Sequence, residues 1–138
     1  MSRRKKPYKP KSFESTGVSN DTSANIYESM MQSAAFMDLT PKQKLLYLYM
    51  KAQYYGKRKP QKDFPDIPQF QGDDLFYFPM GTAEKYGLYT RSNHTRFYDD
   101  IKALAAHGFI EIVSNGKTHK VKSIYRYSDK WRLWNDSS

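Results

Sequence analysis

Residues 82–127 read TAEKYGLYTRSNHTRFYDDIKALAAHGFIEIVSNGKTHKVKSIYRY. The segment opens with a short helical stretch that Thr82 can cap and that Gly87 ends, because glycine adopts turn conformations closed to most other residues. Residues 91–105 then carry apolar side chains at the spacing of an amphipathic helix. Two strand-like stretches follow around Asn115-Gly116, a dipeptide typical of tight hairpin turns. The segment therefore predicts helix, turn, helix and hairpin in unbroken order.

Helix-turn-helix followed by a β-hairpin is the element order of a winged-helix DNA-binding domain. Upstream, Thr40-Pro41 predicts the start of another helix, since threonine caps well and proline fits the first turn. The apolar positions of that helix, spaced i, i+3, i+4 and i+7, are Leu45, Leu48, Tyr49 and Ala52. The aromatic run Leu75-Phe76-Tyr77-Phe78, which ends at Pro79, predicts a short edge strand. We therefore expect an α+β winged helix-turn-helix fold of about three core helices with a small antiparallel sheet and a hairpin wing.

The chain divides into a basic flexible arm, residues 1–25, and a winged-helix domain, residues 26–138, with an N-terminal helical extension. The extension is expected to begin with one short helix over residues 26–37, with Met30, Ala34 and Met37 on one face. Dimerisation through residues 26–55 is one alternative left open. The apolar side chains that would support a dimer there are Met30, Met37, Tyr47 and Tyr54.

The helix over residues 91–105 is expected to have a buried and an outer face. We expect Ser92 or Asn93 to cap it. The expected buried stripe is Phe97, Ile101, Leu104 and Ala105. The residues expected toward the outer side are Asn93, Arg96, Asp100 and Ala103.

In the hairpin, Phe109 and Ile112 are expected to be buried on the first strand. One face of the return strand is expected to hold Val121, Ser123, Tyr125 and Tyr127, and one or both Trp rings of the final WRLWN are expected to pack on the domain.

Positive charge is unevenly distributed along the chain, which carries a net charge of +9 in 138 residues. Residues 1–11 hold six basic side chains and no acid, and residues 39–62 hold seven basic side chains and no acid. Residues 63–116 reverse the balance, with eight acids against four bases. Segregated positive charge is typical of proteins that bind polyanions, although it also serves solubility.

The beginning of the 91–105 helix is the expected DNA-reading element. Its consecutive polar side chains are Arg91, Ser92, Asn93, His94, Thr95 and Arg96. Arginine pairs bidentately with guanine or clamps phosphate, asparagine reads adenine, and hydroxyl side chains contact phosphate or the thymine methyl group. A capped helix with a solvated face is the alternative explanation for the same residues.

Two further basic segments are expected to assist. The hairpin tip carries Lys117, Thr118, His119, Lys120 and Lys122, which can reach a flanking groove or a row of phosphates. The N-terminal arm includes Arg3, Arg4, Lys5 and Lys6, which resemble the arms that enter a minor groove. A polar hairpin tip and a solubilising tail remain the alternatives.

Catalysis, metal binding and membrane insertion have little support. The chain has no cysteine, and its three histidines lack the spacing of a metal site. Adjacent acids such as Asp99 and Asp100 point to different sides of a helix, which argues against a shared acid–base site. We expect no cofactor and no enzyme activity. No apolar run is long enough to span a membrane, and a cytoplasmic location is expected.

The string FYDDIKALAAHGFIEIVSNGKTHKVKSIYRYSDKW resembles the second half of winged-helix proteins encoded by bacterial plasmids and integrative elements. Such proteins include replication-initiator-like and conjugation-accessory types. The shared pattern is aromatic-x-x-[DE]-Ile-x-x-Leu, then Gly-Phe-Ile, a hairpin, and Tyr-x-x-Ser-x-x-Trp. In this chain the pattern falls on Phe97 or Tyr98, Ile101, Leu104, Gly108 to Ile110, Tyr125, Ser128 and Trp131. The resemblance covers residues 75–134.

The resemblance implies a sequence-specific double-stranded DNA-binding protein of a mobile genetic element, acting in replication, transfer or transcription control. It also implies protein partners of a replication or transfer complex and association with the bacterial nucleoid or a plasmid. A winged-helix protein–protein interaction module and an RNA-binding accessory domain are the alternatives.

Overall fold

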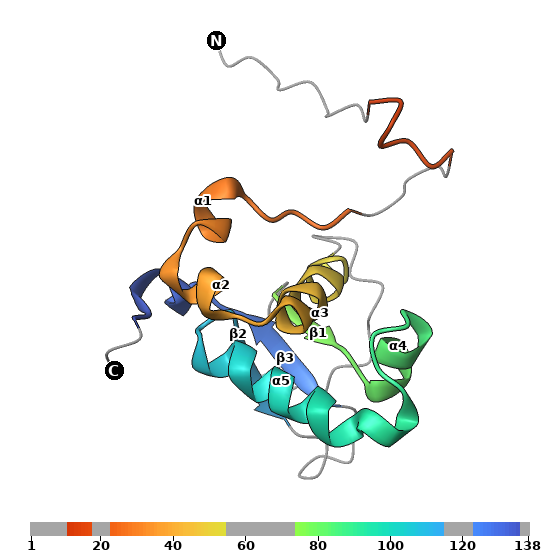
Figure 1. Cartoon of the computed structure of the whole chain (residues 1–138), viewed down its shortest axis with the longest axis vertical. Coiled ribbons are helices and arrows are strands. Elements are labelled where there is room, and N and C mark those ends of the chain that lie inside the picture. Colours follow the sequence, from red (N-terminus) through yellow and green to blue (C-terminus); the bar gives the residue numbers. More distant parts are fainter. Residues whose placement is uncertain (1–10, 18–22, 55–73, 115–122, 136–138) are drawn as a thin grey trace.

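The computed structural model describes residues 11–17, 23–54, 74–114 and 123–135 (Figure 1). In chain order its helices and strands are α1 (Glu28–Met31), α2 (Ala34–Asp38), α3 (Pro41–Lys51), β1 (Leu75–Tyr77), α4 (Met80–Lys85), the 3-10 turn η3 (Arg91–Asn93), α5 (His94–Ala106), β2 (Ile110–Ser114), β3 (Ile124–Tyr127) and the 3-10 turn η4 (Lys130–Leu133). The combination of helices with a small antiparallel sheet confirms the expected α+β class.

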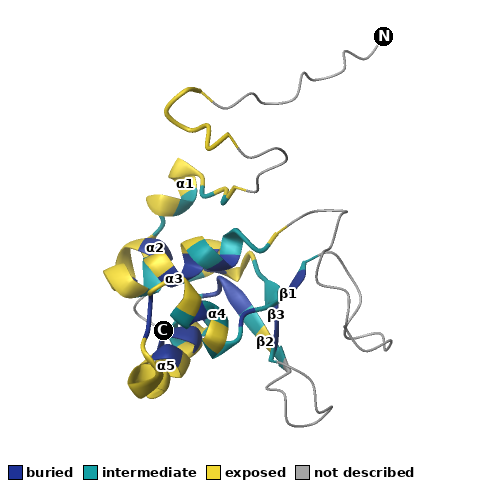
Figure 2. Cartoon of the chain, turned by 90° about the vertical axis from the view of Figure 1, so that its right-hand side faces the viewer, coloured by how far each residue is buried: buried dark blue, intermediate teal, exposed yellow. Residues whose placement is uncertain are grey.

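The three strands form one antiparallel sheet in the order β1-β3-β2. Tyr125 on the central strand lies opposite Phe76 of β1 and Ile112 of β2. The helices lie on one side of this sheet (Figure 2). β1 is an edge strand, as its length and the following Pro79 predicted. The Asn115-Gly116 turn and the tip residues 117–122 lie outside the described residues.

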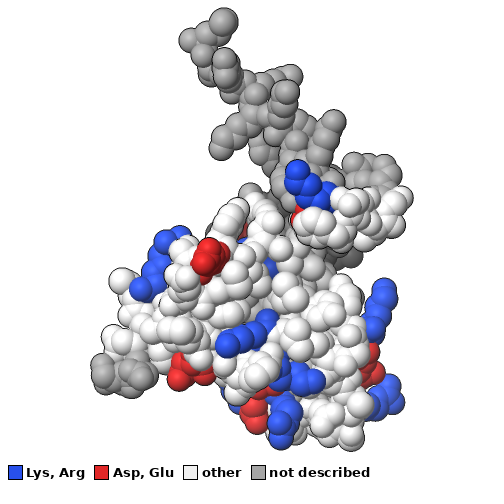
Figure 3. Space-filling view, turned by 45° about the horizontal axis from the view of Figure 1, so that its top comes forward, with Lys and Arg blue, Asp and Glu red and all other residues white. Residues whose placement is uncertain are grey.

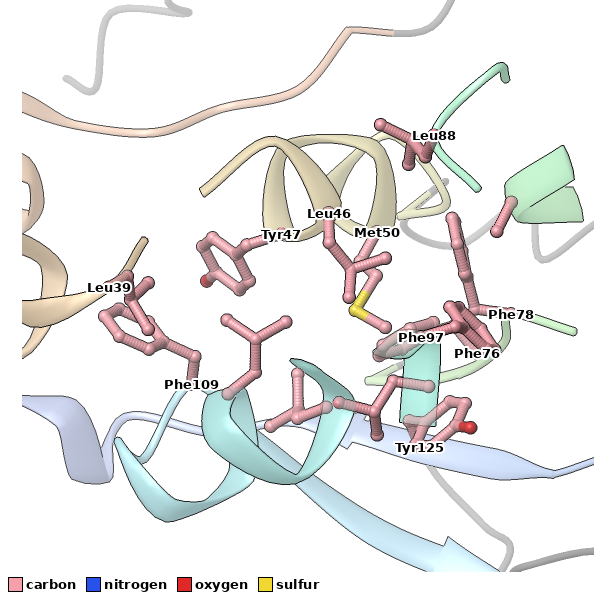
Figure 4. Close-up of a cluster of buried hydrophobic side chains, with 14 of the residues drawn as sticks. Leu39, Leu46, Tyr47, Met50, Phe76, Phe78, Leu88, Phe97, Phe109 and Tyr125 are labelled. Atoms are coloured by element: carbon pink, nitrogen blue, oxygen red, sulfur yellow. The ribbon is translucent and has the colours of Figure 1, made fainter. Parts of the chain in front are cut away.

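The core lies between this sheet and helices α3 and α5, and it is rich in aromatic rings (Figure 4). Phe76 of β1 stacks on Tyr127 of β3 with ring centroids 4.3 Å apart. Tyr47 of α3 reaches Phe109, the residue before β2, at 5.0 Å. Aromatic rings bury a large area per residue, so a chain of only 38% hydrophobic residues can still build a core.

Helix α3 begins where Thr40-Pro41 predicted it. Thr40 and Gln43 form a reciprocal capping box, in which each side chain accepts from the other residue's backbone N–H. Two residues of the predicted core stripe were wrong, because Leu45 and Leu48 are 45% and 38% exposed. The other two, Tyr49 and Ala52, are half-buried, and Tyr49 packs against the core. A different set, Leu46, Tyr47 and Met50, is buried instead. The helix has apolar residues on both faces, and spacing alone does not distinguish which face meets the core.

The N-terminal extension differs from the single helix expected over residues 26–37. It consists of two short helices, α1 and α2, separated at Ser33. The Ser33 hydroxyl accepts a hydrogen bond from the Phe36 N–H at 3.2 Å and so starts α2 anew. Met37 is 64% exposed, whereas Tyr47, expected among the exposed apolar residues, is buried.

Strand β2 begins at Ile110, after the buried Phe109, and Ile112 is 44% exposed although it was expected to be buried. An irregularity in the pairing between Ile112 and Ser114 shifts the register at this edge. On β3, Tyr125 is buried as expected and Tyr127 is half-buried. Val121 lies outside the described residues.

The C-terminal segment packs back on the domain, as the two tryptophans predicted. The rings of Trp131 and Phe109 lie 6.0 Å apart and nearly parallel. Trp134 stacks on His107 at 4.6 Å. This packing requires a glycine at position 108. Gly108 has φ +86°, and a Cβ at this position would lie 2.4 Å from the backbone nitrogen of Trp131.

Candidate nucleic-acid interface

The turn between α4 and α5 directs the chain into the predicted reading helix. Helix α4 starts at Met80 with Pro79 as N-cap, not at a Thr82 cap as expected. Gly87 then takes φ +74°, the left-handed conformation that the sequence predicted for the end of this helix. Leu88 and Tyr89 follow and are both buried, and the Leu88 N–H donates to the Ala83 carbonyl at 3.0 Å. The turn is therefore anchored before the exposed residues begin.

The start of the predicted reading helix is a 3-10 turn that leads into α5. Thr90 is the N-cap of this turn and forms a capping box with Asn93. Asn93, one of the two expected caps, is the N-cap residue of α5, but its side chain makes no capping hydrogen bond there. The Asn93 side-chain oxygen accepts from both the backbone N–H and the hydroxyl of Thr90. The Ser92 hydroxyl lies 3.0 Å from the Thr90 hydroxyl. Bidentate reading of adenine by Asn93 would require its side-chain oxygen to leave the cap.

The buried side of α5 fixes the orientation of the helix. Phe97, Ile101 and Leu104 lie in the core as expected, and Ala105 is partly buried against it. Asp100 was expected on the outer side, and that expectation was wrong, since its residue is only 8% exposed. A buried carboxylate needs hydrogen-bond donors, and two donors from other segments reach it.

Those two donors are Tyr89 and Gln43. The Tyr89 hydroxyl donates to one oxygen of Asp100 at 2.6 Å, and the Gln43 amide donates to the other at 3.0 Å. Lys42, next to Gln43, donates to the Leu88 carbonyl at 2.7 Å. The first turn of α3 therefore holds both α5 and the turn that precedes it.

Burial raises the pKa of Tyr89 well above its ordinary value. The hydrogen bond to Asp100 and the charge of Asp100 raise this pKa further, and the charge of Arg96 opposes the shift.

All six predicted reading residues are exposed. They are Arg91, Ser92, Asn93, His94, Thr95 and Arg96. His94 is turned partly back, with its Nδ1 3.3 Å from the Arg91 carbonyl. The stretch is continuous and polar, and it stands at one end of a helix whose opposite face is buried.

The exposed face continues along α5 beyond these six residues. Thr95, Tyr98, Asp99 and Lys102 are all exposed and share one side of the helix at 100° per residue. Tyr98 and Lys102 were not among the predicted site residues. The spacing i, i+3, i+4 and i+7 from Thr95 is the signal that could have identified them. Asp99 adds a negative charge that disfavours phosphate but can accept from the cytosine amino group.

Lys and Arg side chains interspersed with Asp and Glu gather along the lower part of the face seen in Figure 3, while much of the surface between them is neutral. Two basic residues near the sheet are paired with acids. Arg126 lies 3.3 Å from Asp74, and Lys130 lies 3.3 Å from Glu111. No such ion pair involves Arg91, Arg96 or Lys102 within the described part of the chain.

The predicted contact residues also include the wing and the N-terminal arm. Lys117, Thr118, His119, Lys120 and Lys122 lie outside the described residues, and so do Arg3, Arg4, Lys5 and Lys6.

The far end of α5 is held by His107. Its Nδ1 lies 2.6 Å from the Ala103 carbonyl, and its Nε2 lies 2.8 Å from the Asp38 carboxylate of α2. Both partners are acceptors, so the ring makes both hydrogen bonds only when both nitrogens carry a proton. His107 therefore lies at the C-terminus of α5, where a donor or a cation is favourable.

Within the residues that the structure describes, no three His, Asp or Glu side chains come together as a metal site. None of the described helices has both the length and the apolar character needed to cross a membrane. Comparison with protein-family models, with curated proteins and with solved structures finds no match for this chain.

Proposed function

We propose that this chain is a winged-helix protein that binds double-stranded DNA in a sequence-specific manner, with η3 and the start of α5 in the major groove. The observation that carries the proposal is the contrast between the two faces of α5. One face is locked by the core and by the Tyr89–Asp100–Gln43 network, and the other presents an unbroken polar run from Arg91 to Arg96. A reading helix needs both a fixed orientation and side chains free to meet base edges.

The arrangement of the elements supports the same proposal. Helix α3, strand β1, helices α4 and α5, and the antiparallel pair β2–β3 follow in the order expected of a winged helix, and β1 pairs with β3. In this assignment α3 supports the reading helix, and the segment between β2 and β3 is the wing. The net charge of +9 favours a polyanion as partner.

The six exposed residues have different roles in this proposal. Arg91 and Arg96 are the base or phosphate contacts, because neither has an acidic partner among the described residues. Asn93 primarily caps the helix through Thr90. Tyr98 and Lys102 extend the contact along α5, where lysine neutralises a phosphate and tyrosine makes apolar or hydroxyl contacts.

A role on a mobile genetic element, in replication, transfer or transcription control, is the biological setting we propose. It rests on the resemblance of residues 75–134 to winged-helix proteins of plasmids and integrative elements. In this proposal the chain is not an enzyme, needs no cofactor, and acts at bacterial DNA.

Fluorescence anisotropy with a labelled random-sequence duplex tests DNA binding. The intact chain should bind, and the logarithm of its affinity should fall with the logarithm of salt concentration by about 0.9 for each phosphate neutralised. A chain lacking residues 1–25 should retain binding. Absence of binding by the intact chain at low salt would contradict the proposal. If deletion of residues 1–25 abolished binding, the assignment of the DNA contact to α5 would be wrong. Stronger binding to single strands or to A-form RNA would favour the RNA-binding alternative.

A further inference from the structure

The outer face of α3 is apolar and partly exposed. It consists of Leu45, Leu48 and Ala52, which lie on one side of the helix at i, i+3 and i+7. Leu45 and Leu48 are exposed, and Ala52 is half-buried. The opposite side of the same helix already supplies Leu46, Tyr47 and Met50 to the core. Core packing therefore does not account for the leucines on the outer face.

Aromatic residues extend this face toward α4. Tyr49, at the margin of the outer face, stacks on Tyr86 with ring centroids 4.5 Å apart. The Tyr86 hydroxyl accepts from the Gln53 amide at 3.0 Å, and Tyr86 is itself 37% exposed. The apolar surface is thus shared between two helices and held by contacts between them, as expected of a preformed docking surface.

Three lysines flank the outer face, and each is held by an aromatic ring. Lys42 lies on one side, with its amine 5.3 Å from the Tyr89 ring centre. Lys44 and Lys51 lie on the other side, over Phe36 at 5.4 Å and over Tyr127 at 5.2 Å. Within the described residues, no carboxylate forms an ion pair with any of the three. The face is therefore a leucine stripe between two positively charged margins.

We propose that the outer face of α3 docks an acidic amphipathic helix of another protein. Apolar anchors at i, i+3, i+4 and i+7 on such a helix would cover Leu45 and Leu48, and its flanking Glu or Asp side chains would meet the three lysines. Charge complementarity decides against a second copy of this chain, because a two-fold interface would bring the same lysines face to face. A DNA backbone would satisfy the lysines but would leave the leucines in water.

Three synthetic peptides test the proposal by isothermal titration calorimetry against the full chain. The first has leucines at i, i+3, i+4 and i+7 and glutamates elsewhere on its exposed face. The second replaces every glutamate with lysine, and the third scrambles the first. We expect binding by the acidic amphipathic peptide and at least about tenfold weaker binding by the other two, which is the effect of removing one good apolar or charged contact. Equal binding by all three, or no binding of the acidic amphipathic peptide, would overturn the proposal.

A matched pair of variants locates the binding. The Leu45→Gln/Leu48→Gln variant should lose at least about tenfold in affinity for the acidic amphipathic peptide. Ile112 lies at the sheet edge and is 44% exposed, close to the 45% of Leu45. The Ile112→Gln variant should therefore bind the acidic amphipathic peptide with an affinity within about twofold of the parent. Unchanged peptide binding by the leucine variant would overturn the proposal. A dimer of the parent chain in sedimentation that the leucine variant abolishes would also overturn it, since a second copy would then occupy the face.

Duplex binding by the same variants separates this proposal from the proposed function. The leucine variant should bind duplex DNA within about twofold of the parent, because the phosphate contacts assigned to α5 are unaffected. If the acidic amphipathic peptide does not bind but duplex DNA does, only the proposed docking surface on α3 is contradicted. If the peptide binds but duplex DNA does not, only the proposed DNA-binding function is contradicted.

Discussion

The Tyr89 hydroxyl donates a 2.6 Å hydrogen bond to the Asp100 carboxylate, across the turn that leads into α5. Gln43 of α3 donates to the other carboxylate oxygen at 3.0 Å. One buried acid thus ties together three segments whose relative positions set the direction of the proposed reading helix. This arrangement makes Asp100 a positioning residue rather than a contact residue, and it separates Asp100 from its exposed neighbour Asp99.

The first prediction compares these two neighbours. Asp100→Ala should lower the free energy of unfolding by about 1–3 kcal/mol, because it leaves the Tyr89 hydroxyl and the Gln43 amide without their acceptor. Asp99→Ala, at the exposed position, should change it by less than about 0.5 kcal/mol. Urea unfolding followed by circular dichroism measures both. Equal effects of the two substitutions would contradict the assignment of Asp100 to the interior.

A second prediction concerns the two faces of α3. Leu46→Ala should cost about 2–5 kcal/mol of unfolding free energy, because Leu46 is fully buried in the core. Leu45→Ala, one residue earlier on the outer face, should cost less than about 1 kcal/mol. Chemical denaturation of the two variants compares them directly. A larger loss of unfolding free energy for Leu45→Ala than for Leu46→Ala would mean that Leu45 faces the core, as residue spacing alone predicts.

A third prediction concerns two glycines in different surroundings. Gly108→Ala should destabilise the fold by more than about 2 kcal/mol, since φ +86° disfavours any side chain and the new Cβ would lie 2.4 Å from the Trp131 nitrogen. Gly81, within α4, has no positive φ, and a Cβ added there would meet no described atom within 4 Å. Gly81→Ala should therefore stabilise the helix by about 0.5–1 kcal/mol. Thermal unfolding should show shifts of opposite sign, and a tolerated Gly108→Ala would disprove the close approach.

A fourth prediction concerns alkaline pH. Burial raises the pKa of Tyr125 from 10.0 to about 12. Because the folded chain keeps this proton to higher pH than the unfolded chain does, its contribution to stability is complete below pH 10 and is lost as the pH rises through about 12. Stability measured by urea unfolding should decline across this window, by at most about 3 kcal/mol from this residue. Tyr125→Phe should reduce the decline, and an unchanged pH profile would contradict the burial argument.

Much of the fold could be predicted from local chemistry. Thr40-Pro41, Gly87 and the edge strand before Pro79 act through capping, left-handed backbone and missing hydrogen-bond donors, which depend on few neighbours. The same holds for the buried stripe Phe97, Ile101 and Leu104, because the rest of α5 is polar. These features were all found where the sequence predicted them.

The errors arose where tertiary packing decides between local alternatives. Helix α3 is apolar on two faces, and only its contacts with Phe109 and Asp100 select Tyr47 and Gln43 as the inward side. Asp100 was expected in solvent because a buried acid requires partners, and its partners Tyr89 and Gln43 lie 11 and 57 residues away along the chain. Tyr98 and Lys102 of the candidate site were missed because the prediction covered only the start of the helix and not the continuation of its exposed face.

Sequence-specific binding by α5 can be measured by in vitro selection from a duplex library with a randomised centre. The selected duplex and a random duplex are then compared by anisotropy. We expect the chain to enrich a defined sequence and Arg96→Ala to reduce the discrimination between the two duplexes by about 1–3 kcal/mol. Arg132→Ala, which removes an exposed cation from η4, should weaken binding to both duplexes equally or leave both unchanged. Failure to enrich any sequence, or equal losses on both duplexes for Arg96→Ala, would contradict the reading of bases by this face of α5.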